Sequence, residues 1–259
     1  MRIIRYLSVT VFLVIVMNGC LHFQKNRDVL FQTSTINVLL EGGYDGEMTY
    51  EKLKHRGDFG IGTFNGLDGE MIGLEDKFYQ VKADGRAYLV DDSMKTPFAV
   101  VTFFEPDKSA LLDKAENYGQ LEQHLDKLLP TENIFYAVKI EGAFKYIKTR
   151  SVPRQNKPYP LLVEVVKNQS TFEFNNVKGT IVGFWCPSYV EGINVPGYHL
   201  HFITEDRKAG GHLLECHLQN ARIDVDYTSE FYMALLKSDE FYKMDLTGKK
   251  QKELEKVER

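Results

Sequence analysis

The chain has 259 residues, of which 43% are hydrophobic and 26% are charged, a composition that excludes a disordered or collagen-like protein. The 32 Lys and Arg residues against 36 Asp and Glu residues give a formal net charge of −4, so no positive excess indicates a nucleic-acid partner. Three cysteines are too few for a disulfide-stabilised scaffold.

The first nineteen residues have the pattern of a secretory signal peptide. Arg2 and Arg5 provide a positive start, and the apolar stretch 6–17 follows them. This stretch is shorter than the roughly 20 residues that span a bilayer, but it suits the apolar core of a signal peptide. Gly19-Cys20 then resembles a bacterial lipoprotein cleavage site, at which the cysteine is lipidated. We therefore expect an exported protein, extracellular or anchored to the membrane through Cys20, with ordinary secretion or an uncleaved anchor as alternatives.

The body of the chain begins after an expected polar tether at residues 20–34. Glycines between apolar and aromatic residues predict short strands joined by tight turns in an N-terminal β-rich lobe, residues 35–150. The run 98–104 is apolar on both faces and predicts a central strand. The other expected strands are 36–40, 59–64, 70–74, 77–82, 135–140 and 143–149, with a helical turn at 49–55.

The period of the apolar residues changes once in this half. Leucines in 109–129 recur mostly at intervals of three and four, which predicts an amphipathic helix or a helix pair. The proline-rich stretch 150–160 predicts a loop at the boundary between two lobes.

The second half is expected to form a C-terminal metal-binding lobe, residues 151–259. Its closing stretches, 229–236 and 249–259, are expected to be helical or mixed. Taken together, the pattern predicts an α+β fold, a strand-rich two-lobed architecture with mixed β-sheets and a few helices. The expected strands are 161–166, 171–174, 179–185, 198–204 and 212–218.

Two histidines separated by one residue carry the clearest chemical signal. In a strand, His199 and His201 project from one face about 7 Å apart, while Leu200 and Phe202 project from the other. Two such imidazoles can bind one cation together with a third from a neighbouring strand. Three protein ligands leave positions open for a substrate, which is the pattern of a catalytic metal site, and zinc suits imidazole ligands best.

The identity of the third histidine is open at this level. A symmetric hairpin that turns at residues 207–208 places His217 opposite His199, whereas placing His212 opposite His201 requires a different register. Two glycines before His212 can support a bulge, so turn geometry does not decide between them. An accidental pair of histidines on an exposed strand face is the remaining alternative.

Three segments, taken with these histidines, resemble the α-acetolactate decarboxylase family. They are 63–72 (TFNGLDGEMI), 149–155 (TRSVPRQ), and 198–202 (YHLHF) followed by Gly211-His212. The resemblance runs in the same order from about residue 36 to the C-terminus, and the combination is specific. It implies a zinc site formed by His199, His201 and His212, which leaves His217 as a neighbour or a core residue.

The resemblance also implies further site residues and an assembly. A glutamate of the family matches Glu70, an arginine matches Arg150 at the start of the proline-rich stretch, and a glutamate comes from the C-terminal tail. We match the last to Glu258, with Glu253 and Glu255 as close alternatives. The family implies a homodimer in which sheets continue across the interface.

The reaction of this family explains these residue types. A carboxy-lyase converts 2-acetolactate to acetoin and CO₂, in the route toward butanediol, and loss of CO₂ leaves an enediolate that is then protonated. A zinc ion chelated by the substrate oxygens stabilises that charge as a Lewis acid. Arg150 offers a planar fork of donors to the carboxylate or the enediolate, and Glu70 is expected to orient the substrate hydroxyl or relay a proton. The proton donor stays open among the two carboxylates, Arg150 and a water molecule.

Two other functions are compatible with the residues alone. A zinc-dependent hydrolase could use the same three histidines to activate water. A non-catalytic zinc-binding lipoprotein could capture the metal for uptake, although such proteins favour a flexible histidine-rich segment.

Two cysteines in the second half allow two outcomes. Cys186 and Cys216 could pair as a disulfide in an oxidising compartment, or remain as free buried thiols.

Overall fold

The computed structural model describes residues 28–258. The predicted signal peptide 1–19, the predicted lipidation site Cys20 and most of the expected tether lie outside these residues. A strand, β1 (Val29–Thr33), occupies the last part of the expected tether and is buried.

The first sheet has seven strands and is mixed. β1 runs parallel to β14, whereas the other neighbouring strands pair antiparallel. β8 lies in the interior of the sheet and all four of its residues are buried, which confirms the central strand predicted within 98–104. A separate pair of two-residue strands, β2 (Met48–Thr49) and β7 (Lys95–Thr96), lies nearby. The strand order is β14 (Glu230–Ala234), β1, β8 (Ala99–Thr102), β3 (Phe59–Thr63), β4 (Glu70–Leu74), β5 (Lys77–Val81) and β6 (Ala87–Leu89).

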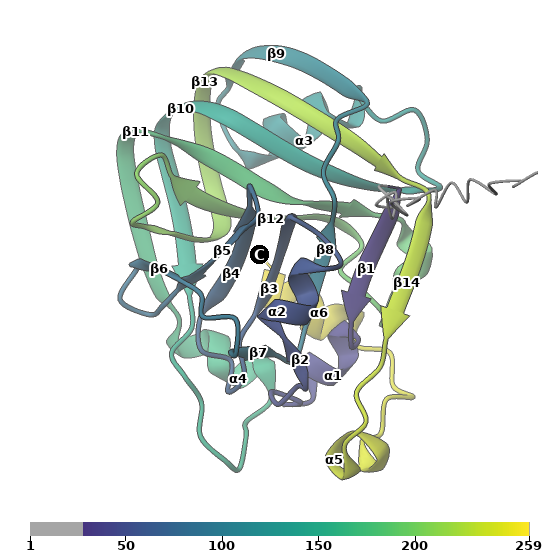
Figure 1. Ribbon diagram of the computed structural model, residues 1–259. Coiled ribbons are helices and arrows are strands. Elements are labelled where there is room, and N and C mark those ends of the chain that lie inside the picture. Colours follow the sequence, from purple (N-terminus) through teal and green to yellow (C-terminus); the bar gives the residue numbers. More distant parts are fainter. Residues whose placement is uncertain (1–27, 259) are drawn as a thin grey trace, which may run out of the picture.

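The second sheet has five antiparallel strands, four of which close on themselves. β10 pairs with β11 and β13, and β12 also pairs with both β11 and β13, so these four strands form a ring. The long strands arch over the first sheet in Figure 1. β12 and β13 pair only through 201–203 and 210–212. The strands are β10 (Phe135–Ser151), β11 (Ser170–Cys186), β12 (Gly197–Thr204), β13 (Gly210–Thr228) and β9 (Lys108–Ala115).

The buried hydrophobic residues that the structure describes form three cores, two of which lie next to the histidine-bearing strand β12 or between the sheets. Leu200 and Phe202 of β12 pack in one core with Leu121 and Leu125 of helix α3 (Tyr118–Asp126), inside the ring of strands. A second core joins the two sheets, with Ile61 and Ile72 from the first sheet and Val182 and Phe184 from β11. Both sheets therefore bury one face against the other, and the residues between them share one interior.

Two predicted strands are helices. Residues 36–40 form α1 (Ile36–Leu40), which begins after Thr35, whose side chain accepts a hydrogen bond from the Val38 N–H. Residues 161–166 contain α4 (Leu162–Val165), whose buried residues Leu162 and Val165 are three positions apart. The predicted helical turn at 49–55 is confirmed as α2 (Tyr50–Lys54). Two short 3₁₀ helices, η1 (Val166–Asn168) and η2 (Ser188–Val190), complete these connections.

Two predicted helical segments are strands instead. The first part of 109–129 is β9, an edge strand with alternating exposure, and only its second part is helical, as α3. Residues 229–236 contain β14, which pairs in parallel with β1. The last segments are helical: α5 (Asp239–Lys243) and α6 (Gln251–Glu258).

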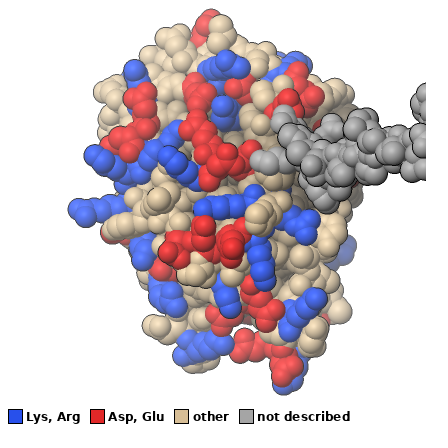
Figure 2. Space-filling view, viewed as in Figure 1, with Lys and Arg blue, Asp and Glu red and all other residues tan. Residues whose placement is uncertain are grey.

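The fold is the strand-rich α+β class with mixed sheets that the sequence predicts. Figure 2 shows Lys and Arg side chains intermixed with Asp and Glu over one face. Within residues 28–258, no helix is both long enough and apolar enough to cross a membrane.

Candidate active site

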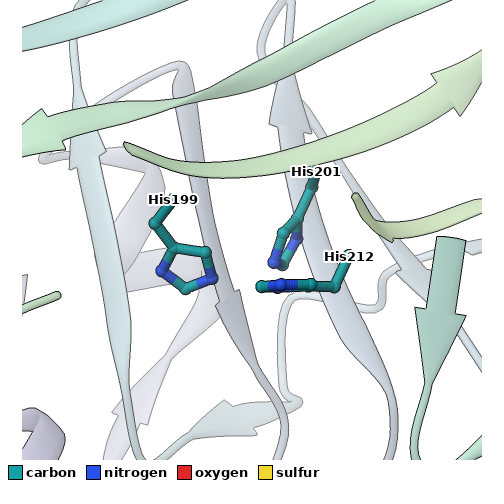
Figure 3. A group of neighbouring side chains, drawn as sticks. All are labelled: His199, His201 and His212. Atoms are coloured by element: carbon teal, nitrogen blue, oxygen red, sulfur yellow. The ribbon is translucent and has the colours of Figure 1, made fainter. Parts of the chain in front are cut away.

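Three histidines project from the second sheet toward the first. His201 on β12 stands opposite His212 on β13, and His199 lies two residues before His201 on the same face. Their ring centroids are 5.1 to 5.3 Å apart, and the three rings point toward one another in Figure 3. One nitrogen of each ring can be chosen so that all three lie within 4.8 Å of one another. Such a group can hold one metal ion.

The hairpin register places His212, and not His217, in this group. The Thr204 N–H donates to the Ala209 carbonyl, and Arg207 adopts φ +58° in the five-residue loop 205–209 that joins β12 to β13. The centre of the hairpin therefore lies about one and a half residues earlier than the symmetric alternative requires, and His217 lies opposite Tyr146 on β10. The symmetric register, with His217 opposite His199, is wrong.

Gly211 allows β13 to approach β10 just before His212. Its φ is +138°, and a Cβ atom there would lie 2.4 Å from the Arg150 carbonyl oxygen. No other residue fits this position without displacing the backbone. The glycine thus sets the position of His212 and brings it opposite Arg150 in the β10–β13 pairing.

The hydrogen bonding of the three rings leaves nitrogen atoms free for a metal. His201 Nδ1 lies 2.9 Å from the Met71 carbonyl oxygen, so this nitrogen donates and Nε2 carries the lone pair. His201 Nε2, His199 Nδ1 and His212 Nδ1 are buried and have no hydrogen-bond partner among the described residues. Orphaned buried imidazole nitrogens are costly. A cation held by one nitrogen of each ring would give such atoms a partner, so these residues fit the zinc that the family resemblance implies.

Burial keeps the three imidazoles neutral. It lowers the pKa of His199 to about 3, and the positive charge of Arg150 acts in the same direction. Burial also holds the pKa values of His201 and His212 well below the usual value. Neutral imidazole is the form that binds a metal ion.

Arg150 and Glu70 form a buried ion pair beside the histidines. Arg150 Nη1 donates to Glu70 Oε1 at 3.0 Å, and Nη2 donates to the Val257 carbonyl at 3.0 Å. Arg150 Nε is buried without a partner among the described residues. Arg150 lies in β10 and not in the proline-rich loop, because the strand continues to Ser151. A strand holds this guanidinium more rigidly than a loop.

Of the three candidate glutamates in the tail, helix α6 brings Glu258 to the histidines. Its Oε2 atom lies 3.5 Å from His199 Nε2 and 3.9 Å from His212 Nε2. Glu253 instead lies 3.7 Å from Lys250 Nζ, and Glu255 is exposed and accepts a hydrogen bond from Gln251.

Burial also changes the acidity of both site carboxyl groups. It raises the pKa of Glu70 to about 7, against the lowering effect of Arg150. It likewise raises the pKa of Glu258 to about 7, again opposed by Arg150. Each group can hold or release a proton near neutral pH.

A small cavity of about 40 Å³ lies among these groups, and part of its wall was not predicted. Thr63 contributes a hydroxyl that donates to the Gly69 carbonyl at 2.7 Å. Ile36 and Leu39 of α1 and Leu162 of α4 supply apolar surface. The family resemblance includes the segment that contains Thr63. The sequence predicts strands where α1 and α4 form, so it does not predict that these two helices line the cavity.

The two described cysteines are free and buried. Cys186 belongs to the core between the sheets, whereas Cys216 belongs to the core inside the ring of strands. Because a sheet separates the two cores, the disulfide that the sequence allows is not formed.

Comparison with known proteins agrees with this geometry. The sequence pattern of the Alpha-acetolactate decarboxylase family matches residues 30–248. The α-acetolactate decarboxylase of Methanosarcina mazei is 55% identical over 232 residues, covering 90% of this chain and 81% of that protein. That of Brevibacillus brevis is 49% identical over 221 residues, covering 85% and 78%. The crystal structure of α-acetolactate decarboxylase from Bacillus subtilis strain 168 superimposes with a TM-score of 0.87 at 41% identity, covering 89% of this chain and 99% of that one. The chain belongs to the α-acetolactate decarboxylase family.

Proposed function

We propose that this protein decarboxylates 2-acetolactate to acetoin and CO₂, with a zinc ion held by His199, His201 and His212. The observation that carries the proposal is the group of three buried imidazoles with unpartnered nitrogens, set beside Arg150 and two buried carboxyl groups. The names of the relatives supply the substrate.

The metal and the protein contribute different parts of the chemistry. Bound zinc supplies a Lewis acid that stabilises negative charge on the substrate oxygens. The imidazoles that hold it are kept in place by neighbouring groups, of which the Met71 carbonyl on His201 is the clearest.

Arg150 binds the anionic part of the substrate. Glu70 and the Val257 carbonyl hold its two terminal nitrogens, which fixes the plane of the guanidinium. Its unpartnered Nε–H is then available to a substrate carboxylate or enediolate oxygen. A charge-assisted hydrogen bond of this kind strengthens as negative charge develops.

The two glutamates have separate roles. Glu70 Oε1 already accepts from Arg150, so Glu70 positions the arginine, and its other oxygen remains to orient the substrate hydroxyl. Glu258 Oε2 is buried beside His199 and has no hydrogen-bond partner among the described residues. We assign to Glu258 the proton that is delivered to the enediolate carbon after CO₂ leaves.

An acetoin assay tests this function. The purified protein is freed of metal with a chelator, supplied with one equivalent of Zn²⁺ and incubated with 2-acetolactate. Acetoin and CO₂ should form in equal amounts, stop on removal of the metal and return on its addition. A zinc-loaded protein that forms no acetoin would contradict the decarboxylase and favour the hydrolase or the zinc-capturing lipoprotein.

The sequence supports two further proposals about the protein in the cell. We propose that residues 1–19 are removed on export and that Cys20 carries the lipid that anchors the chain to the membrane. We also propose that the protein is a homodimer, as the family resemblance implies, which sedimentation of the purified protein tests.

A further inference from the structure

A large cleft adjoins helix α6, which also lines the small cavity. It has a volume of about 570 Å³ and runs between α3 and α6, with the facing parts of β12 and β13 forming its wall. Tyr198 of β12 and Leu214 of β13 contribute to that wall. The mechanism proposed above gives this cleft no role.

The two helices line the cleft with acidic side chains. Glu122 and Asp126 are four residues apart on α3, so they share one helix face, and Glu255 and Glu258 are three residues apart on α6. Among the described residues that line the cleft, none is Lys or Arg.

The Tyr198 hydroxyl lies close to the acidic side chains of α3. Its hydroxyl donates to Asp126 Oδ1 at 2.9 Å. Burial raises the pKa of Tyr198 most, and the hydrogen bond to Asp126 and the charges of Asp126 and Glu122 raise it further. The two carboxylates of α3 thus act on the wall that separates the cleft from the histidines.

The cleft continues to the metal centre through Glu258. This residue lines both the cleft and the small cavity, and its unpartnered Oε2 lies 3.5 Å from His199 Nε2. Beside it, β12 and β13 are no longer paired, because their pairing covers only 201–203 and 210–212. Side chains, and not backbone hydrogen bonds, close the wall between Tyr198 and Leu214.

We propose that this cleft is the access route by which a divalent cation reaches His199, His201 and His212, and that Glu122 and Asp126 raise the rate of its capture. The inference rests on the metal centre of the proposed function. The acidic lining of the cleft attracts a cation and repels an anion. Glu258, which faces both spaces, passes the ion from the cleft to the imidazoles.

The rate of zinc uptake by the metal-free protein tests the route. Zn²⁺ released from a chromophoric indicator is followed by stopped flow at low ionic strength. The test protein carries Glu122→Gln with Asp126→Asn, which keep size and hydrogen-bonding capacity. The control carries Glu141→Gln with Glu205→Gln, which remove the same charge from a different surface cavity.

We expect the cleft variant to take up zinc roughly 10-fold more slowly than the wild type, and the control to differ less than 2-fold. The difference should vanish near 1 M salt, where the screening length is about 3 Å. Glu122→Lys should slow uptake further, and every protein should finish with one zinc per chain. Equal rates in the cleft and control variants, or a slowing that high salt leaves intact, would overturn the route. A wild type that binds no zinc at equilibrium would instead refute the metal centre.

Discussion

His201 and His212 face each other across the shortest strand pairing of the ring, with ring centroids 5.3 Å apart. The pairing follows from a five-residue loop and from Gly211, which together fix which side chains meet. His199 joins the pair because residues two apart in a strand share a face. Three imidazoles therefore converge from only two strands.

Replacing one of these histidines should remove the metal. His212→Ala leaves two imidazole ligands, so we expect the purified variant to contain less than about a tenth of an equivalent of zinc and to form no acetoin. Elemental analysis and the acetoin assay measure the two effects. His217→Ala, on the same strand, is the control and should retain both. An active His212→Ala protein without metal would refute the ligand assignment.

Arg150→Lys should keep the zinc and lose most of the activity. Lysine retains the charge but cannot bind Glu70, the Val257 carbonyl and the substrate at once. We expect kcat/KM to fall roughly 100-fold or more, with zinc content unchanged. Arg154→Lys, an exposed arginine in the following loop, should change kcat/KM less than 2-fold. Near-normal rates for Arg150→Lys would exclude a role in substrate binding.

Glu258 can be distinguished from its neighbours in α6. Glu258→Gln removes the proposed proton donor, so we expect kcat to fall roughly 100-fold or more while zinc still binds. Glu253→Gln and Glu255→Gln, which point away from the histidines, should keep kcat within 2-fold when loaded with zinc. Equal losses in all three variants would mean that the helix, and not the Glu258 carboxyl group, matters.

Asp226 should make the protein less stable as the pH rises. Burial raises its pKa from 3.8 to about 7, and the nearby charges of Asp107, Asp28 and Glu105 add to this. The folded state therefore binds the proton more tightly than the unfolded chain, and stability is lost between about pH 4 and pH 7. We expect Asp226→Asn to raise the free energy of unfolding by on the order of 2 kcal/mol at pH 8, and to change it little at pH 4.

Denaturant unfolding at the two pH values measures this effect. Asp113→Asn, an exposed carboxylate on β9, should change the free energy of unfolding by less than about 0.5 kcal/mol at both. An Asp226→Asn protein with the same stability change at pH 4 and pH 8 would show that folding does not raise the pKa of Asp226.

Lipid labelling tests the proposed anchor. A chain expressed with its first twenty residues in a bacterium fed a radiolabelled fatty acid should carry the label, and Cys20→Ala should abolish it. Cys186→Ala serves as the control and should leave labelling intact, because that thiol is buried. Labelling of Cys20→Ala at the wild-type level would exclude the lipoprotein cleavage site.

The sequence correctly predicts those elements of the site in which the apolar residues follow a strong local pattern. The alternation around His199 and His201 correctly placed Leu200 and Phe202 on the opposite face of the strand, which the structure buries in a hydrophobic core. The prediction of a strand at 36–40, which forms α1, was wrong because a run of four or five apolar residues is compatible with both a buried helix and a buried strand. There the capping side chain of Thr35 was the usable signal.

Long-range pairing explains the other differences. β9 and β14 are strands because they add to the edges of sheets whose partners, β13 and β1, are distant in the sequence. The identity of the third histidine depends on the register of a hairpin, which the residues alone do not specify. The family resemblance identified it as His212. The Arg150–Glu70 pair joins residues eighty positions apart, so no local pattern predicts its geometry.

The three histidines belong to the second sheet, yet the Met71 carbonyl that orients His201 comes from β4 of the first sheet. The ion pair between Arg150 and Glu70 also joins the two sheets. If heat or denaturant shifts the two sheets relative to each other, the three histidines will therefore lose their alignment while most strands are still intact. We therefore expect activity to fall before the circular dichroism changes as the protein is heated or denatured.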